Sequence, residues 1–169
     1  EAMADTVMPG ESSGHPFVIE NTGGLPFSYD VMVVYPSGDV LLFEDFESGV
    51  IPDGWMMNTN SAVGWFYQTG AFDGPYWDVP DNGSSYMLSH DDATNDDGSV
   101  DYLIMPAQDF TEQGEVGLSF DSYFTGAYGQ TAHVEVSTDA GYSWTEVAML
   151  ESASDWVNVT VDLSGYAGM

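Results

Sequence analysis

Five aspartates crowd one short stretch of the chain, SHDDATNDDGSVDY at residues 89–102, and such crowding points to cation chemistry. Like charges held together repel, and a calcium ion, which takes about six to eight oxygen ligands, would turn that repulsion into coordination. A solvated acidic loop is the alternative. The stretch is no EF-hand, because aligning Gly98 with that motif's glycine leaves Ala93 and Ile104 at ligand positions. The five residues are Asp91, Asp92, Asp96, Asp97 and Asp101.

The composition narrows the partners that the chain can bind. It has 169 residues, with 28 Asp and Glu, 3 His and neither Lys nor Arg, so its formal net charge is -28. Nucleic acids, anionic membranes and phosphates are bound mainly through Lys and Arg, and Schiff-base chemistry requires Lys. We therefore expect no nucleic-acid partner and no membrane insertion, and we expect Ca²⁺ from solvent as a counter-charge.

The absence of Lys and Arg also removes every site at which a trypsin-like protease cuts. Together with the strong acidity, this favours an extracellular or cell-surface location among proteases or salt. A general acidic bias of a salt-adapted source explains the same composition equally well.

Hydrophobic and polar residues alternate along several segments, and helical spacing is almost absent. Such a two-residue period is typical of strands, and clusters rich in Gly, Asp, Asn and Pro separate the segments. With 43% hydrophobic residues the chain can bury a core. We predict an all-β protein with a β-sandwich architecture. The residues that share one face of each segment are Phe27, Tyr29, Val31, Val33 and Tyr35, then Val116, Leu118 and Phe120, then Ala132, Val134 and Val136, then Val157, Val159, Val161 and Leu163.

A boundary is expected at Pro36-Ser37-Gly38-Asp39. Residues 1–38 resemble the hairpin that closes immunoglobulin-like modules of bacterial surface proteins, with the turn at Asn21-Thr22-Gly23-Gly24. So short a segment is marginal alone, and we expect it to be completed by the following domain, by sequence upstream of it, or by strand addition from another copy. Residues 39–169 form the main predicted domain.

The main domain resembles the cleaved-adhesin or choice-of-anchor-J family, related in fold to MAM domains. The matching pieces, in order, are residues 46–49 (FESG) with 51–55 (IPDGW), 101–106 (DYLIMP) and 136–139 (VSTD). The resemblance implies a jelly-roll module of a secreted surface protein, usually non-catalytic and often calcium-bound. It also implies that further strands normally follow the DLSGYAG stretch, so the domain is expected to lack its last strands. The metal ligands that it nominates are Glu47 or Asp45 together with Asp91, Asp92 and Asp101.

The segment STDAGYSW at residues 137–144 matches the Asp-box pattern. We interpret it as a structural hairpin, in which Asp139 caps turn amides, Gly141 takes a positive φ and Trp144 packs under the loop. Sialidases repeat this box, but they bind the substrate carboxylate with arginines, which this chain lacks.

Aromatic residues around a Gly- and Pro-rich loop offer a second kind of site. Tyr76 and Trp77, with Trp65 nearby, could form a platform that stacks on sugar rings, although aromatic residues more often fill cores. The three histidines, His15, His90 and His133, show no metal-binding spacing, and no nucleophile motif is present.

These observations favour a non-enzymatic, calcium-stabilised extracellular module that acts in adhesion or assembles with copies of itself into a surface fibre. The alternative is a carbohydrate-binding accessory module of a secreted peptidase or glycoside hydrolase.

Overall fold

The structure is a computed structural model, and it describes residues 40–75, 77–89 and 99–169. This part of the chain is all-β, as predicted, with only two short 3-10 helices, η1 (Ala127–Gly129) and η2 (Ser164–Tyr166). The strands are β1 (Met56–Thr59), β2 (Trp65–Thr69), β3 (Phe72–Asp73), β4 (Asp78–Val79), β5 (Ser85–Ser89), β6 (Asp101–Ile104), β7 (Gly117–Ser122), β8 (His133–Val136), β9 (Thr145–Met149) and β10 (Val157–Asp162).

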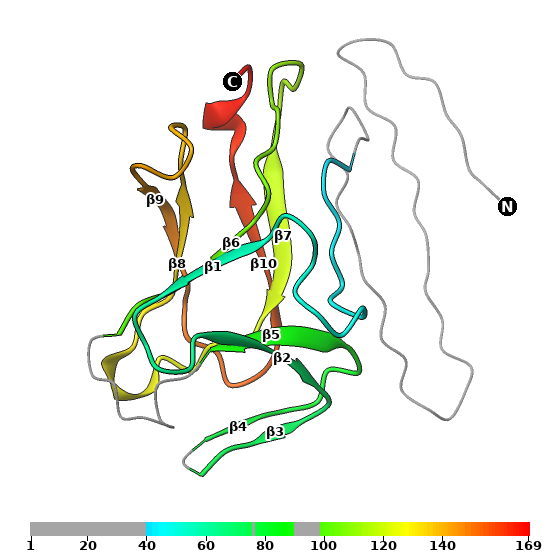
Figure 1. The fold of residues 1–169 in the computed structure, drawn as a ribbon, viewed down its shortest axis with the longest axis vertical. Coiled ribbons are helices and arrows are strands. Elements are labelled where there is room, and N and C mark those ends of the chain that lie inside the picture. The colour runs from blue at the N-terminus through cyan, green and yellow to red at the C-terminus, as the bar shows by residue number, and fades with distance from the viewer. Residues whose placement is uncertain (1–39, 76, 90–98) are drawn as a thin grey trace, which may run out of the picture. The chain divides into compact units, whose positions relative to one another are not determined.

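The described strands pair into five antiparallel two-stranded ribbons: β1–β6, β2–β5, β3–β4, β7–β10 and β8–β9 (Figure 1). Three ribbons join strands that are near in sequence, whereas β1–β6 and β7–β10 join strands that are far apart. The sheets are small and do not close on one another. Each strand therefore keeps one edge that pairs with no other described strand. The boundary expected near residue 38 falls outside the described residues.

The main core lies between the β7–β10 and β8–β9 ribbons. Val161 of β10 is buried, together with Val116 and Leu163 beside the ribbon, and the inward side chains of both ribbons pack against them. The register places Val159 opposite Phe120 and Val161 opposite Leu118, so the predicted alternation is confirmed at these positions, whereas Val157 at the start of β10 is exposed. The outer face carries polar contacts, among them the bond from Asn158 Nδ2 to Asp121 Oδ1.

A second core forms where the β2–β5 and β3–β4 ribbons meet the chain next to β7 and β10. Tyr86 and Leu88 of β5 and Val79 of β4 are buried in it. Trp156 packs edge-on against Tyr86 with ring centroids 5.0 Å apart, and its Nε1 donates to the carbonyl of Pro80 at 2.7 Å. This tryptophan links the β10 end of the chain to the β2–β5 ribbon.

The C-terminal end is tied back to the middle of the chain. The Phe110 amide donates to the Met169 carbonyl, and the Gly168 amide donates to the Phe110 carbonyl, each at 2.8 Å. Helix η2 begins after Leu163, whose amide donates to Val116. Among the residues described, no helix is long and apolar enough to cross a membrane.

Candidate functional site

Hydroxyl groups from three parts of the chain converge on the Asp101 carboxylate at the start of β6. Ser61 Oγ donates to Oδ1 at 2.8 Å, Thr59 Oγ1 donates to the same oxygen, and Ser89 Oγ donates to Oδ2 at 2.6 Å. Trp65 Nε1 donates to the Asp101 carbonyl at 3.0 Å. The residue thus joins the end of β1, the following loop, the end of β5 and the start of β2.

These contacts favour the ionised form of the Asp101 carboxylate. Partial burial raises its pKa, but the hydrogen bonds from Ser89, Thr59 and Ser61 together outweigh that effect, and the pKa is lowered from its ordinary value. The carboxylate is therefore ionised at neutral pH and stabilised by hydroxyl donors. It lies where the chain leaves residues 90–98, which carry Asp91 and Asp92 and lie outside the described residues.

Glu47 makes a comparable contact with the other end of β5. Its Oε1 accepts from Ser84 Oγ at 2.8 Å and from the Ser85 amide at 2.7 Å, and its Oε2 accepts from Ser85 Oγ at 3.1 Å. Ser85 is buried, and its hydroxyl also contacts the Tyr67 hydroxyl at 3.0 Å. The Ser84 hydroxyl is the main cause that lowers the pKa of Glu47. Through these hydrogen bonds, Glu47 connects the loop before β1 to the β2–β5 ribbon.

The two carboxylates lie apart because Glu47 binds Ser85 and Asp101 binds Ser89. Four residues of strand separate these serines by about 13 Å. A single Ca²⁺ with ligands at about 2.3–2.6 Å cannot take both carboxylates in this arrangement. Asp45 Oδ1 accepts from the Glu47 amide at 3.0 Å and so belongs to the Glu47 end.

The described residues alone do not build a metal centre. In this part of the chain no three Asp, Glu or His side chains gather as metal ligands would. Carboxylate oxygen suits Ca²⁺ at Asp101, but further ligands would have to come from residues 90–98. Binding of calcium by Asp101 with Asp91 and Asp92 remains a prediction.

Sequence reasoning missed the hydroxyl partners. Ser85, Met87 and Ser89 share one face of β5, opposite the buried Tyr86 and Leu88. The alternation of SYMLS contains this signal, because serines at both ends of an otherwise apolar strand need polar partners. Nothing in the sequence says which carboxylate each serine meets.

The aromatic residues nominated for sugar stacking are engaged in the fold. Trp77 packs on Phe72 with ring centroids 5.3 Å apart and belongs to the second core, and Trp65 is half-buried with its Nε1 bonded to Asp101. Tyr76 lies outside the described residues. Trp77 therefore contributes ring surface to the second core, and the Trp65 indole N–H is used within the fold.

The Asp-box hairpin has the structure predicted for it. Asp139 Oδ1 accepts from the Ser143 amide and from Ser137 Oγ, both at 2.8 Å, and Oδ2 accepts from Ser143 Oγ at 2.6 Å. Donation by Ser143 is the largest cause that lowers the Asp139 pKa to about 2. Gly141 has φ 86°, as expected, and Trp144 stacks on Tyr102 with ring centroids 6.3 Å apart.

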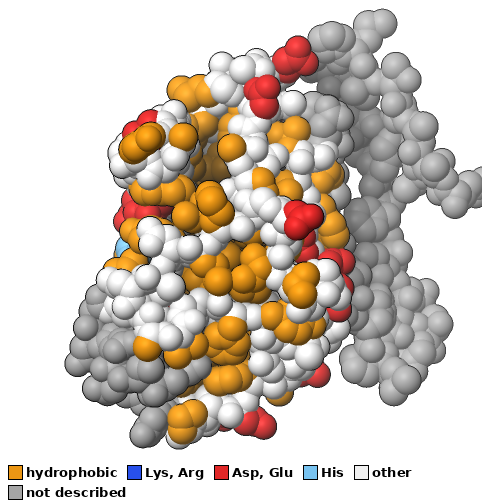
Figure 2. All heavy atoms as spheres, in the orientation of Figure 1, with side chains coloured by type: hydrophobic (Ala, Val, Ile, Leu, Met, Phe, Trp, Pro, Cys, Tyr) orange, Lys and Arg blue, Asp and Glu red, His pale blue; other side chains and the backbone are white. Residues whose placement is uncertain are grey.

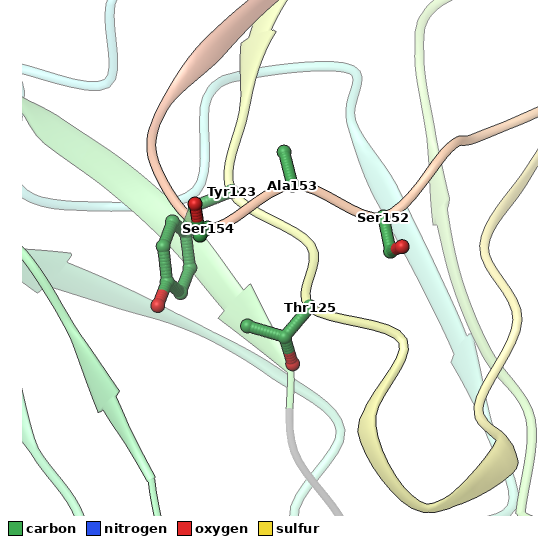
Figure 3. A pocket seen from close by; sticks show the side chains of 5 residues that line it. All are labelled: Tyr123, Thr125, Ser152, Ala153 and Ser154. Atoms are coloured by element: carbon green, nitrogen blue, oxygen red, sulfur yellow. The ribbon is translucent and has the colours of Figure 1, made fainter.

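A shallow hollow of about 320 Å³ opens beside the β7–β10 ribbon, lined by Tyr123, Thr125 and Ser152–Ser154. Its walls are held by the bond from the Ala153 amide to the Phe124 carbonyl at 2.8 Å. The lining side chains point in different directions rather than toward a common centre (Figure 3). The hollow therefore has the character of a surface depression.

His133 is the histidine that the described residues include. Its Nδ1 lies 2.9 Å from Glu146 Oε2 on the outer face of the β8–β9 ribbon. This contact is a cross-strand pair at the surface.

Comparisons of the chain with family models, with curated proteins and with solved structures find no match.

Proposed function

We propose that the chain is a non-catalytic, extracellular β-sheet module of a surface protein that works by associating with copies of itself through free strand edges. In this proposal the ribbons are parts of a jelly-roll-type sandwich that is completed by strands from a neighbour. The acidic surface keeps copies apart until salt or calcium screens it.

One observation carries the proposal. The described strands form five two-stranded ribbons, and each strand has an edge whose N–H and C=O groups pair with no other described strand. A two-stranded ribbon is marginally stable alone, and free edges accept strands from other chains. The cores support the ribbons on their inner faces, and in this proposal the edges that pair with no other described strand accept strands from a neighbour.

Calcium has a supporting role in the proposal. Asp101 would hold the ion together with Asp91 and Asp92, and the ion would lower the repulsion between acidic loops on neighbouring copies. The hydroxyl groups of Ser61, Thr59 and Ser89 would keep the Asp101 carboxylate in place for that purpose.

Sedimentation velocity of the full chain over a range of protein concentrations tests the proposal, with negative-stain microscopy of the same samples. We expect species larger than the monomer at high protein concentration, increasing with NaCl and with CaCl2. A monomer at every concentration, salt level and calcium level would contradict it. Retention on polysaccharides by such a monomer would instead support the carbohydrate-binding alternative.

A further inference from the structure

The longest interval without an acidic residue in this chain runs from Asp53 to Asp73. It contains both β1 and β2, in a protein whose formal net charge is -28. Two copies of so anionic a protein repel most strongly where carboxylates face each other. An uncharged strand is therefore the part of the surface where close approach costs least.

Strand β1, with the sequence MMNT, is the exposed element of this interval. All four of its residues are exposed, and Met56 and Met57 retain 60% and 41% of their accessible surface. Val63 and Val100 nearby are also exposed large hydrophobic residues. Figure 2 shows hydrophobic side chains gathered in the middle of the view, around the place where β1 and β6 lie in Figure 1, with acidic side chains mostly toward the margins.

One edge of β1 pairs with no other described strand, and this free edge lacks the features that usually protect an edge strand. Its pairing with β6 runs without interruption from Met56 opposite Ile104 to Thr59 opposite Asp101, so no bulge twists it away. It carries no proline and no charged side chain. Natural edge strands normally use such features to prevent pairing with other chains.

We propose that the free edge of β1 is the contact by which two copies of this chain associate, with β1 of one copy pairing antiparallel to β1 of the other. This inference rests on the proposed function and assigns that association to one strand. A two-fold axis between the strands makes the contact self-complementary and gives the strand order β6-β1-β1-β6. In the symmetric register Met57 of each copy faces Asn58 of the other, and no two charges meet.

The contact is small, because only four residues of each copy pair. Interfaces of this size are at the weak, transient end of the range for protein association. We therefore expect a reversible dimer that forms at high protein concentration. Because screening shortens the reach of the remaining carboxylates, NaCl should strengthen the dimer rather than dissociate it.

Two glutamate variants with matched exposure provide the test in sedimentation velocity of the full chain. Met56→Glu places a charge on β1, and Met149→Glu places the same charge on β9, where the methionine is 57% exposed. We expect Met56→Glu to weaken the dimer at least tenfold, and Met149→Glu to leave the dimer close to that of the unmodified chain. Unchanged far-ultraviolet circular dichroism and melting temperature would show that both variants fold.

Cysteine cross-linking tests the register independently, since the natural chain has no cysteine. A mixture of Met57→Cys and Asn58→Cys chains should form disulfide dimers faster than either chain alone, because these positions face each other. Two results together would overturn the assignment to β1: equal dimerisation of Met56→Glu and the unmodified chain, and no faster disulfide formation in the mixture of cysteine variants than in either variant alone. Assembly through another strand edge would still be consistent with these results. A strictly monomeric unmodified chain would overturn both this inference and the proposed function.

Discussion

Asp139 shows how a single carboxylate can hold a turn without any basic partner. Its oxygens accept from Ser137 and from both the amide and the hydroxyl of Ser143. The next residue, Ala140, adopts a strained conformation, because its φ is 59° although it carries a Cβ. The hydrogen bonds to Asp139 therefore determine whether the β8–β9 hairpin closes in this form.

We predict that Asp139→Ala lowers the melting temperature by about 2–4 °C, the shift expected for loss of one capping side chain in a chain of this size. The hydrogen bonds depress the folded pKa from 3.8 to about 2. The contribution of Asp139 is therefore present above pH 3.8 and disappears as the pH falls toward 2.

Melting curves of both chains between pH 7 and pH 2 measure this difference. General protonation of the carboxylates affects both chains, so the difference between the two melting temperatures isolates Asp139. A difference that persists undiminished at pH 2 would argue against the hydrogen-bonded carboxylate as its source.

Asp101 is the described residue at which calcium binding can be tested. We predict that CaCl2 raises the melting temperature of the unmodified chain and that Asp101→Asn abolishes most of this increase. A ligand that binds only the folded chain stabilises it by about 2.7 kcal/mol at a hundredfold excess over its Kd. The comparison uses the calcium-dependent increase, because loss of hydroxyl contacts also lowers the starting stability of Asp101→Asn.

Asp109→Asn is a suitable control for calcium, since Asp109 also accepts from a neighbouring hydroxyl, that of Thr111 at 2.7 Å. NaCl and MgCl2 at matched ionic strength separate specific binding from general screening. An equal response of the unmodified chain and Asp101→Asn to calcium would remove Asp101 from the metal site.

For single residues, the sequence predicted the role of a side chain better than it predicted the hydrogen-bond partners of that side chain. The Asp-box has its capping aspartate and its positive-φ glycine within a few residues, so local pattern was sufficient. Glu47 and Asp101 were nominated together, but each accepts hydrogen bonds from serines that lie 12 to 40 residues away along the chain. Serine is common, and its hydroxyl can donate to or accept from many kinds of group. No sequence period therefore predicts such contacts.

Among the elements, β7, β8 and β10 were predictable because one face of each lies on the core. Val157, Val159 and Val161 alternate with polar residues, and the period of a half-buried strand follows directly. Strand β1 is exposed along its whole length, so burial leaves no pattern there. The assembly of strands into separate ribbons depends on pairings distant in sequence, which alternation alone does not specify.

Trp156 connects the chain next to β10 to the β2–β5 ribbon. We predict that Trp156→Ala costs about 3 kcal/mol of unfolding free energy, the lower end for a core tryptophan, because this one is only partly buried. Trp156→Phe keeps the packing against Tyr86 and loses the bond to Pro80, so its cost should be about 1 kcal/mol.

Urea unfolding followed by circular dichroism measures both costs. The surface substitution Val157→Ala, next in sequence and 39% exposed, should change stability by less than about 0.5 kcal/mol. Equal effects of Trp156→Ala and Val157→Ala would show that the second core does not depend on this ring.

At the scale of the whole molecule, the charge distribution opposes folding and association together. With 28 acidic residues and no Lys or Arg, ion pairs within the chain can involve only histidine or the chain terminus. In the described part His133 contacts Glu146, and this contact is an ion pair only when the imidazole is protonated. Self-repulsion of a high net charge destabilises a compact state. Solvent cations must therefore supply the screening that basic side chains provide in other proteins.

We predict that NaCl raises the melting temperature continuously between 0.01 M and 1 M, as the Debye length falls from about 30 Å to about 3 Å.

The dependence of stability on pH should show the same effect, with a maximum on the acid side of neutrality. At that pH, partial protonation of ordinary carboxylates reduces their repulsion, whereas Glu47, Asp101 and Asp139 are still ionised and hydrogen-bonded. The pKa of each of these three is depressed, so their stabilisation persists to lower pH than that of ordinary carboxylates. Calorimetry at each salt concentration and pH tests both trends. A melting temperature that is independent of NaCl would mean that the carboxylates lie too far apart for their repulsion to matter, and it would remove the electrostatic reason for association through the uncharged β1 strand.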